Sequence, residues 1–552
     1  MKRFPMSRAA RAVILVLGAG CAFPALGQDQ PVVPSHPGNR RLVPLPAATA
    51  QGVPLSLGQA VGIAVANNQD QYVTVNAAES FEYLILQNKG IYDPLITAAV
   101  GRSHAEIPAA SRLTSGIFDD TTFSGGVSQF TPLGGTFTLG FNGTREKSNN
   151  PFTTVNPSYA GGLLFTMNQP LLRNFGTLPS NWLIRIARNS RDSAYQTLLR
   201  TVQGTVNAVE QAYWDLVYAM QNLEVKRESL RIAQELNRIT RIKIDVGSLA
   251  PIDITQTEVG IATAEQDIII SEGQIGDAQD RLKRLLNFVD PSHVNVAIIP
   301  TDRLSTEQVK IQLDEGTQTA LRRRPEVLQI AYAAATDLLR YQYYRNQTLP
   351  YLNLTGQYGS RGLAGFSVDT TTGQVTDTNF SQTFRDVFNR TNKNWSIGLN
   401  FSYPILNRSA RGAAGVARYN WEADRANMTV VEQNVIVEVR AAARAIDTAQ
   451  RSIVAATKGR ELAERNLDAE KKKFDNGMST TFQVNQIQRD LSAARTAEQQ
   501  ALAIYRKAVA QYHFAISDNL DWKGIRVEGL PESEPPIVEI EGGVPAPPPP
   551  SR

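Results

Sequence analysis

The chain has 552 residues, of which 42% are hydrophobic and 20% are charged. Its 56 lysines and arginines are interleaved with 52 acidic residues, so the formal net charge is only +4 and no basic block forms. This balance argues against a nucleic-acid partner, because nucleic-acid-binding surfaces are strongly and locally basic.

The first 27 residues have the pattern of a secretory signal peptide. Lys2 and Arg3 precede the apolar run 12–17, and the residues up to Gly27 offer a small-residue cleavage site. The run is far shorter than the roughly 20 residues that span a bilayer, which argues against an anchor helix. Cys21, the only cysteine, is either removed with this peptide or acylated after cleavage in front of it, as in a lipoprotein. The Pro-rich segment 28–54 is expected to form an extended, poorly ordered arm.

No later stretch has 18 consecutive apolar residues, so the sequence predicts no transmembrane helix after the signal peptide. An exported chain can still cross the outer membrane as β-strands, because their alternating side chains average to a low hydropathy.

Four landmarks occur twice in the same order. The segment LGQAVGIAVANNQD at Leu57 aligns with LDEGTQTALRRRPE at Leu313, an offset of 256 residues. Three further pairs follow: Pro94 with Pro350, Pro170 with Pro404, and Gly247 with Gly477. The shared order predicts two internal repeats, at 55–288 and 313–520, separated by an equatorial linker at 289–312 and followed by a Pro-rich tail at 521–552.

Each predicted repeat contains one very long helix, at 180–246 and at 409–476. A continuous helix over the first range would be about 100 Å long. A further helix opens each repeat, the first over 57–89, and shorter helices follow the long ones at 249–288 and 479–517. Heptad spacing relates Val202, Val209, Leu216, Leu223, Leu230, Asn237 and Ile244, and also Val439, Ile446, Ile453, Arg460, Leu467 and Phe474. Sustained heptads favour coiled-coil-like packing of long helices.

Small residues lie between these stripes, among them Ala212, Ala219, Ala442, Ala449, Ala456 and Ala463. They predict close helix approach on one side and a water-exposed wall on the other. The sequence therefore indicates a helical tube.

The segments 91–169 and 350–403 change to a period of two, which is typical of strands. Ile397, Leu399 and Phe401 share one face of the last strand, opposite small and polar residues. Such a strand suits a barrel wall between lipid and water, or the outer sheet of a soluble sandwich. Aromatic residues near the strand ends favour the membrane: Tyr341, Tyr343, Tyr344, Tyr351, Trp395 and Tyr403.

Two hairpins cannot close a membrane barrel, and open strand edges in lipid are very costly, so strands from sister chains are required. Three copies with four strands each give twelve strands. The turn at 132–135 indicates an additional hairpin over 121–145, which gives six strands per chain and eighteen per trimer.

The duplicated order, the long helices and the paired glycine turns resemble the TolC-like outer membrane efflux family over about residues 55–520. Its most specific matches are NQPLL at 168–172, YPIL at 403–406 and the turns IDVG and FDNG that end at Gly247 and Gly477. The resemblance implies a mainly α protein with membrane β-structure: a homotrimer with one outer-membrane β-barrel and one coiled-coil-like α-helical barrel that extends into the periplasm.

By that resemblance, the two glycine turns form periplasmic tips at which a periplasmic adaptor (membrane fusion) protein docks. The residues concerned are Gly247, Ser248, Leu249, Ala250, Gly477, Met478, Ser479 and Thr480. The residues alone would equally suit mere helix connectors. Family members also constrict this mouth with carboxylates, and the matching positions here are Asp253, Gln483 and Gln486. Gln483 and Gln486 are uncharged, so this chain departs from the family's two acidic rings, and strong cation selectivity is not expected. Asp253 in three copies would still form one acidic ring.

Catalytic chemistry is not indicated. The four histidines are scattered, and neither a phosphate loop nor a nucleophile elbow occurs, so we expect no enzyme activity, no metal site and no cofactor.

The resemblance implies a passive exit duct for small molecules, served by an adaptor and by an inner-membrane pump of RND or ABC type. Two alternatives remain open: a duct for one-step protein secretion, and a periplasmic coiled-coil scaffold without a pore. The sequence does not indicate the transported substrate.

Overall fold

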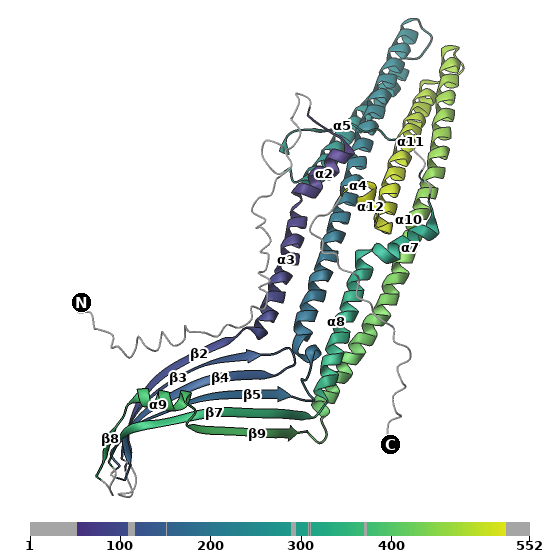
Figure 1. Ribbon diagram of the computed structural model, residues 1–552. Helices are drawn as coiled ribbons and strands as arrows, with labels where there is room; N and C mark the ends of the chain where they lie inside the picture. The colour runs from purple at the N-terminus through teal and green to yellow at the C-terminus, as the bar shows by residue number, and fades with distance from the viewer. Residues whose placement is uncertain are drawn as a thin grey trace, which may run out of the picture. The chain divides into compact units, whose positions relative to one another are not determined.

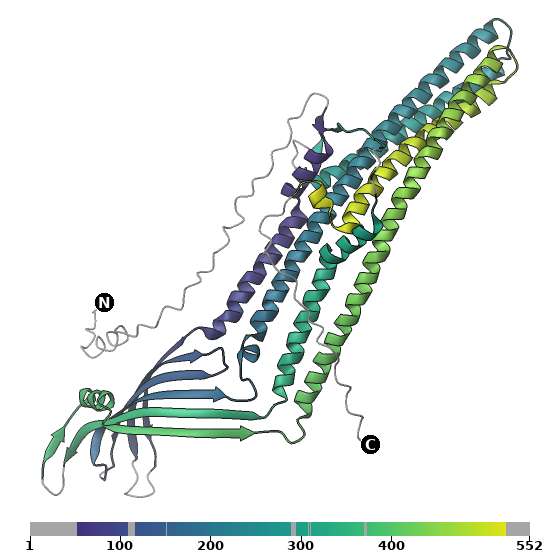
Figure 2. The same ribbon diagram turned by 45° about the vertical axis from the view of Figure 1, so that its right-hand side comes forward.

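The computed structural model describes residues 52–108, 116–150, 152–288, 294–306, 309, 311–368 and 373–525. All of them lie in one of the two units of the chain, Leu45–Arg552. The expected signal peptide with Cys21, and most of the expected arm and tail, lie outside the described residues. Within this unit, long helices run beside one another and lead into a single curved sheet (Figures 1 and 2).

Two helical hairpins dominate the unit. α4 (Thr177–Asp245) turns into α5 (Ile252–Leu286), and α10 (Arg408–Asp475) turns into α11 (Thr481–Ile516). α2 (Leu57–Asn67) and α3 (Gln69–Lys89) pack along α4, whereas α7 (Leu313–Arg323) and α8 (Pro325–Gln347) pack along α10. Among the described helices, none is both long and apolar enough to cross a membrane.

The heptad positions form the seams of these hairpins. The buried members are Val202, Val209, Leu216, Leu223, Asn237, Val439, Ile446, Ile453, Leu467 and Phe474. Ala212, Ala219, Ala442 and Ala449 are buried as well, in agreement with the close helix approach that the sequence predicted on one side of the small residues. An alanine stripe beside a heptad stripe belongs to the packed seam, because its small side chains let the helices approach closely.

The helix expected over 57–89 is interrupted. Asn68 has extended backbone angles, and its side-chain oxygen accepts a hydrogen bond of 2.8 Å from the Asp70 amide, which caps α3. The second repeat has a comparable break at Arg324, where Pro325 disfavours helical geometry in the preceding residue.

Seven strands form one antiparallel sheet. In spatial order they are β2 (Leu95–Glu106), β3 (Ile117–Phe130), β4 (Thr136–Ser148), β5 (Val155–Pro170) and β7 (Tyr351–Val368). β7 then pairs with both β9 (Asn392–Ser402) and the short β8 (Val375–Asp377). The hairpin expected over 121–145 lies within this sheet as β3 and β4. The described residues form an open sheet and not a closed barrel, with β2 and β9 as its long edge strands.

The register gives the sheet one apolar and one small-polar face. Phe141 pairs with Leu163, Phe165 with Tyr358, and Gly356 with Ile397, so one apolar face crosses from β4 to β9. The opposite face carries residues such as Thr138, Asn142, Thr166, Thr355 and Asn400.

The segment 350–403 contains a helix that the strand pattern did not indicate. α9 (Phe380–Phe388) lies between β8 and β9 in the chain and packs on β7 and β5 (Figure 1). Its three phenylalanines recur every fourth residue, which is a helical spacing and not a strand spacing.

Two described segments, at the border of the expected arm and of the expected tail, form regular structure and pack on α4. β1 (Val53–Leu55), in the expected arm, pairs in parallel with β6 (Ile298–Pro300) in the linker. The buried Tyr213 hydroxyl lies within hydrogen-bond distance of the Leu55 carbonyl (3.0 Å) and the Asp302 carboxylate (2.7 Å), which share its one proton, and this contact fixes the strand pair on α4. α12 (Asn519–Trp522) enters the expected tail, and Lys523 forms an ion pair with the buried Glu210 of α4. Both corrections have one cause: buried polar groups need partners, and these segments supply them.

The expected aromatic girdle is only partly exposed. Tyr343 stacks on Trp182 with 4.1 Å between ring centroids, and Tyr341 stacks on Trp421 at 6.1 Å, so these tyrosines of α8 pack between helices. Trp395 on β9 is 72% exposed.

Candidate functional site at the helical turns

Two turns of the same geometry join the long helices to their partners. Gly247 and Gly477 both have φ of +76°. The Gly247 amide donates to the Ile244 carbonyl (2.8 Å), and the Ser248 amide donates to the Lys243 carbonyl (2.7 Å). This pair of bonds is the Schellman motif, which satisfies carbonyls at a helix end and favours glycine at the left-handed position.

The second turn repeats this pattern. The Gly477 amide donates to the Phe474 carbonyl (3.1 Å), and the Met478 amide donates to the Lys473 carbonyl (2.8 Å). Thr480 then caps α11, because its hydroxyl accepts the Gln483 amide at 3.3 Å. The two turns therefore present equivalent backbone shapes.

The predicted docking residues divide into exposed and packed ones. Gly247, Ser248, Ala250, Gly477, Met478 and Thr480 are exposed, Ser479 is half-buried, and Leu249 packs against the core between the two hairpins. The turns also expose apolar side chains that the sequence did not single out: Val246 (69%), Ile252 (67%) and Phe482 (59%). Exposed apolar side chains of this kind are candidates for contact with a partner protein.

Polar contacts join the first hairpin to the second near the turns. The Lys243 ammonium donates to the Phe474 carbonyl at 2.5 Å and lies 4.0 Å from the Asp475 carboxylate. The buried Thr481 hydroxyl donates to Asp253 at 2.7 Å. The Asn485 amide group donates to the Gln256 carbonyl at 3.1 Å. The two hairpins are thus held together at this end by polar bonds as well as by the apolar core.

The three gate candidates have different surroundings. Asp253 is half-buried, and one of its oxygens accepts the bond from Thr481. Gln483 is exposed, and Gln486 bonds along its own helix to Asp490 (3.1 Å) and Arg489 (2.8 Å). No contact recorded among the described residues joins either glutamine to Asp253.

Glu470 is a carboxylate at this site that sequence reasoning missed. It is buried, accepts a hydrogen bond of 2.5 Å from the Ser479 hydroxyl and lies 3.1 Å from the Lys473 ammonium. The Ser479 bond, followed by that of Lys473, lowers the pKa of this carboxyl below its usual range. A signal existed, because Glu470 continues the heptad row of Ala442, Ala449, Ala456 and Ala463 and is an acid in an otherwise apolar seam.

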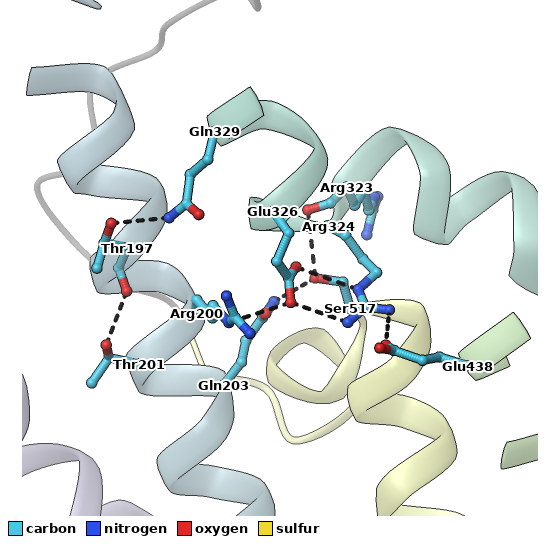
Figure 3. A network of polar contacts seen from close by, with 10 residues as sticks. All are labelled: Thr197, Arg200, Thr201, Gln203, Arg323, Arg324, Glu326, Gln329, Glu438 and Ser517. Atoms are coloured by element: carbon cyan, nitrogen blue, oxygen red, sulfur yellow. Dashed lines mark hydrogen bonds and ion pairs between the residues drawn. The ribbon is translucent and has the colours of Figure 1, made fainter. Parts of the chain in front are cut away.

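A second polar network lies at the break between α7 and α8 (Figure 3). The buried Arg324 donates to Glu438 of α10 at 2.5 Å and to Glu326 at 3.0 Å, and Glu326 also lies 3.3 Å from Arg200 of α4. Burial alone would lower the pKa of Arg324, but Glu438 and Glu326 raise it on balance. The guanidinium therefore stays charged and joins α8 to α10.

The same network joins α4 to the end of α11 (Figure 3). The Gln203 side chain donates to the Ser517 hydroxyl at 2.7 Å, and Ser517 donates to the Arg323 carbonyl at 3.4 Å. Gln329 of α8 donates to Thr197 of α4 at 2.9 Å. These contacts join residues far apart in the sequence, which explains why no sequence pattern revealed them.

Comparison with known proteins agrees with this architecture. The sequence model of the outer membrane efflux protein family matches residues 133–287 and 316–515. The chain belongs to this family. Members of the family are trimeric channels that work with adaptor and inner-membrane pump partners.

Individual relatives are distant in sequence. Nodulation protein T of Rhizobium leguminosarum bv. trifolii is 20% identical over 359 residues, which are 62% of this chain and 71% of the relative. The outer membrane channel CmeC of Campylobacter jejuni has a similar fold, with a TM-score of 0.62 and 16% identity over 84% of this chain and 86% of CmeC. The open state of the Neisseria gonorrhoeae channel MtrE gives a TM-score of 0.55 with 15% identity over 84% of this chain and 89% of MtrE.

The protein is thus an efflux-type outer membrane channel with a helical extension into the periplasm. Channels of this family are not enzymes. Among the residues described, no group of three or more His, Cys, Asp or Glu side chains is arranged to hold a metal ion.

Proposed function

We propose that three copies of this chain form the exit duct of a tripartite efflux pump that exports small molecules. The observation that carries the proposal is the sheet, which has an apolar face, a small-polar face and two unpaired long edges. Open edges are not tolerated in lipid, so β9 of one copy must pair with β2 of the next. Six long strands per chain then give an eighteen-stranded barrel with lipid outside and water inside.

The helices of the three copies extend this duct into the periplasm in the same proposal. Two successive matches of one family model, and two turns of equal geometry, support an origin from two repeats. Each trimer would present six turns, and their exposed apolar side chains suit the tips of an adaptor protein. Asp253, once per chain, would form a single acidic ring at this mouth.

The partners in this proposal are an adaptor protein and an inner-membrane pump of RND or ABC type. Pump and adaptor would deliver the substrate, so the duct itself needs no energy source. A duct for one-step protein secretion uses the same architecture and remains the second candidate function. A scaffold without a pore is disfavoured by the membership of a channel family.

Reconstitution tests the pore. Trimers purified in detergent should give stepwise single-channel currents in planar bilayers and should change electrophoretic mobility on heating. A monomer that stays in aqueous solution without detergent, and that gives no current, would contradict the proposal. Deletion of the gene then separates the two transport functions: increased sensitivity to small toxic compounds supports efflux, whereas loss of a secreted protein supports secretion.

A further inference from the structure

The helix α9 lies on the apolar face of the sheet. Phe384 stacks on Phe141 with 5.0 Å between ring centroids, and Phe380 lies 5.0 Å from Phe123 and 5.3 Å from Tyr159. The register places Phe141, Phe123 and Tyr159 on the face that also carries Leu163 and Phe165. In the proposed barrel this face meets lipid, so α9 lies outside the wall.

Two glycines of the sheet leave space for α9 on this face. Gly161 pairs with Gly362 across β5 and β7. A Cβ atom at Gly161 would lie 2.9 Å from the Thr383 methyl carbon, and one at Gly362 would lie 2.4 Å from the Thr383 carbonyl oxygen. The Thr383 hydroxyl donates to the Tyr159 carbonyl at 2.8 Å, and Thr383 is fully buried. Two glycines in register thus allow the helix backbone to approach the strands closely.

The position of α9 along the strands places it far from the helical bundle. β7 leaves α8 at Tyr351, and Gly362 lies eleven residues further along the strand. β9 begins at Asn392, just after α9, and returns to α10. Both views show α9 near the end of the sheet opposite the long helices (Figures 1 and 2). In the proposed orientation this end is the outer leaflet of the outer membrane.

Positive charge gathers beside this helix. Residues 380–395 contain three cations, Arg385, Arg390 and Lys393, and a single acid, Asp386. All three cations are exposed, and no ion pair to any of them occurs among the described residues. Asp386 accepts a hydrogen bond of 2.9 Å from Gln382 instead.

Arg390 occupies a position that favours glycine. It ends α9 with φ of +58°, and the Thr391 amide behind it donates to the Asp386 carbonyl at 3.0 Å. A left-handed cap costs an arginine more than a glycine. The backbone conformation at this position therefore does not explain why the residue is an arginine. Binding of a ligand by the guanidinium group would explain it.

Exposed aromatic rings accompany the cations. Phe388, at the end of α9, is 58% exposed, and Trp395, two residues after Lys393, is 72% exposed. Aromatic rings next to cations are typical of segments that lie at a membrane surface. Arginine binds phosphate oxygens through two parallel hydrogen bonds, which adds specificity to the attraction.

We propose that α9 and the start of β9 form a binding site for an anionic, phosphate-bearing glycolipid of the outer leaflet. Arg385, Arg390 and Lys393 bind its phosphate groups, and Phe388 and Trp395 contact its acyl chains. This inference rests on the proposed function, because that function places the apolar face in lipid.

A lipid-binding titration tests the site. The probe is lipid A with two phosphates, compared with the same lipid A after removal of its phosphates, and bound copies per trimer are counted by native mass spectrometry in a neutral detergent. The wild type should prefer the phosphorylated lipid. Each cation at an anionic lipid surface contributes roughly a factor of five in affinity. The triple variant Arg385→Gln/Arg390→Gln/Lys393→Gln should therefore lose on the order of a hundredfold at low salt.

A control variant removes the same number of positive charges from α10, far from α9 in the sequence. Arg440→Gln/Arg444→Gln/Lys458→Gln removes three exposed cations of α10 that form no ion pair within the described part of the chain, and it should keep the preference. Equal binding of both lipids by the wild type, or an unchanged preference in the Arg385 triple variant, overturns the inference. Conductance of the same samples separates this failure from failure of the pore: conducting trimers without phosphate preference refute only the lipid site.

Discussion

Two carboxylates at the turns are held in different ways. Asp253 accepts a bond from Thr481 of the opposite hairpin and is half-buried. Glu470 is buried in the seam of α10 and α11 and is stabilised as an anion by Ser479 and Lys473. Asp253 therefore suits a role at the mouth of the proposed duct, whereas Glu470 suits a structural role in the second turn.

Asp253→Asn should reduce the cation preference of the channel. The variant keeps an oxygen that can accept the Thr481 bond, so it removes three charges per trimer with little structural change. The reversal potential under a salt gradient in planar bilayers measures this. Asp245→Asn, an exposed acid at the end of α4, serves as the control and should leave the potential near the wild-type value. An unchanged potential in Asp253→Asn would remove this residue from the gate.

Glu470→Gln should loosen the second turn in a pH-dependent way. Because the folded-state pKa of Glu470 is lowered, its stabilisation is present above the unfolded pKa and is lost as the pH falls through the folded pKa. Hydrogen exchange of the Gly477 and Met478 amides should be faster than in the wild type at neutral pH, and the difference should shrink at acid pH, where the wild-type carboxyl becomes protonated. Glu461→Gln, an exposed acid on the same helix, should have no such effect. A difference that is equal at both pH values would contradict this role.

At the scale of elements, the long helices depend on their seams and on how they end. The buried heptad and alanine rows supply the apolar contacts between α4 and α5 and between α10 and α11. The two Schellman turns then reverse the chain without an unsatisfied end. A substitution at either turn glycine therefore changes backbone strain more than packing, because no described residue beyond the two chain neighbours has an atom within 4 Å of the added Cβ.

Gly247→Ala and Gly477→Ala should each destabilise the protein by about 1 kcal/mol, since alanine is strained at a positive φ. Gly273→Ala and Gly459→Ala make the same chemical change inside α5 and α10, where no described atom outside the adjacent helix backbone lies within 4 Å of the new methyl group. These two should stabilise by up to about 1 kcal/mol. Melting temperatures of the four variants in detergent should thus move in opposite directions, and a common direction would rule out the backbone explanation.

At the scale of the whole molecule, the proposed trimer completes the open sheet with strands of sister chains. The edge strand β2 presents Ala99 on the small-polar face, and the edge strand β9 presents Ser396, Gly398 and Asn400 on the same face. The proposed trimer brings these two rows together across each junction. The sequence contains a single cysteine, Cys21, within the expected signal peptide, so introduced cysteines would have little background.

Ala99→Cys combined with Cys at 396, 398 or 400 should give disulfide-linked dimers and trimers under oxidation, with one pair giving the highest yield. Non-reducing gel electrophoresis of membranes measures this. Ala99→Cys with Leu399→Cys is the control, because Leu399 lies on the opposite face and its Cβ points away from Ala99. Absence of linked species from every pair would contradict the trimeric barrel.

The sequence by itself determined the repeating features of this protein. Heptad spacing identified the seam positions from Val202 to Phe474, and the alternation in β9 identified its two faces. The seam positions and the strand faces both follow from the period of a helix or a strand, and this period can be recognised in a short stretch of sequence. The glycine turns were equally readable, because a left-handed residue after a long helix has few alternatives to glycine.

Only the tertiary structure decided which distant residues meet. The pairing of Asp253 with Thr481, the bonds of Arg324 to Glu438 and the docking of α9 on Gly161 and Gly362 join parts of the chain that no local pattern relates. Tertiary contacts also overrode the expectation for Val53 to Leu55, which form a strand. The physical reason is that the burial and the partners of a residue depend on what packs against it. The periodicity of the sequence indicates only whether the residue lies in a helix or a strand and which face it occupies.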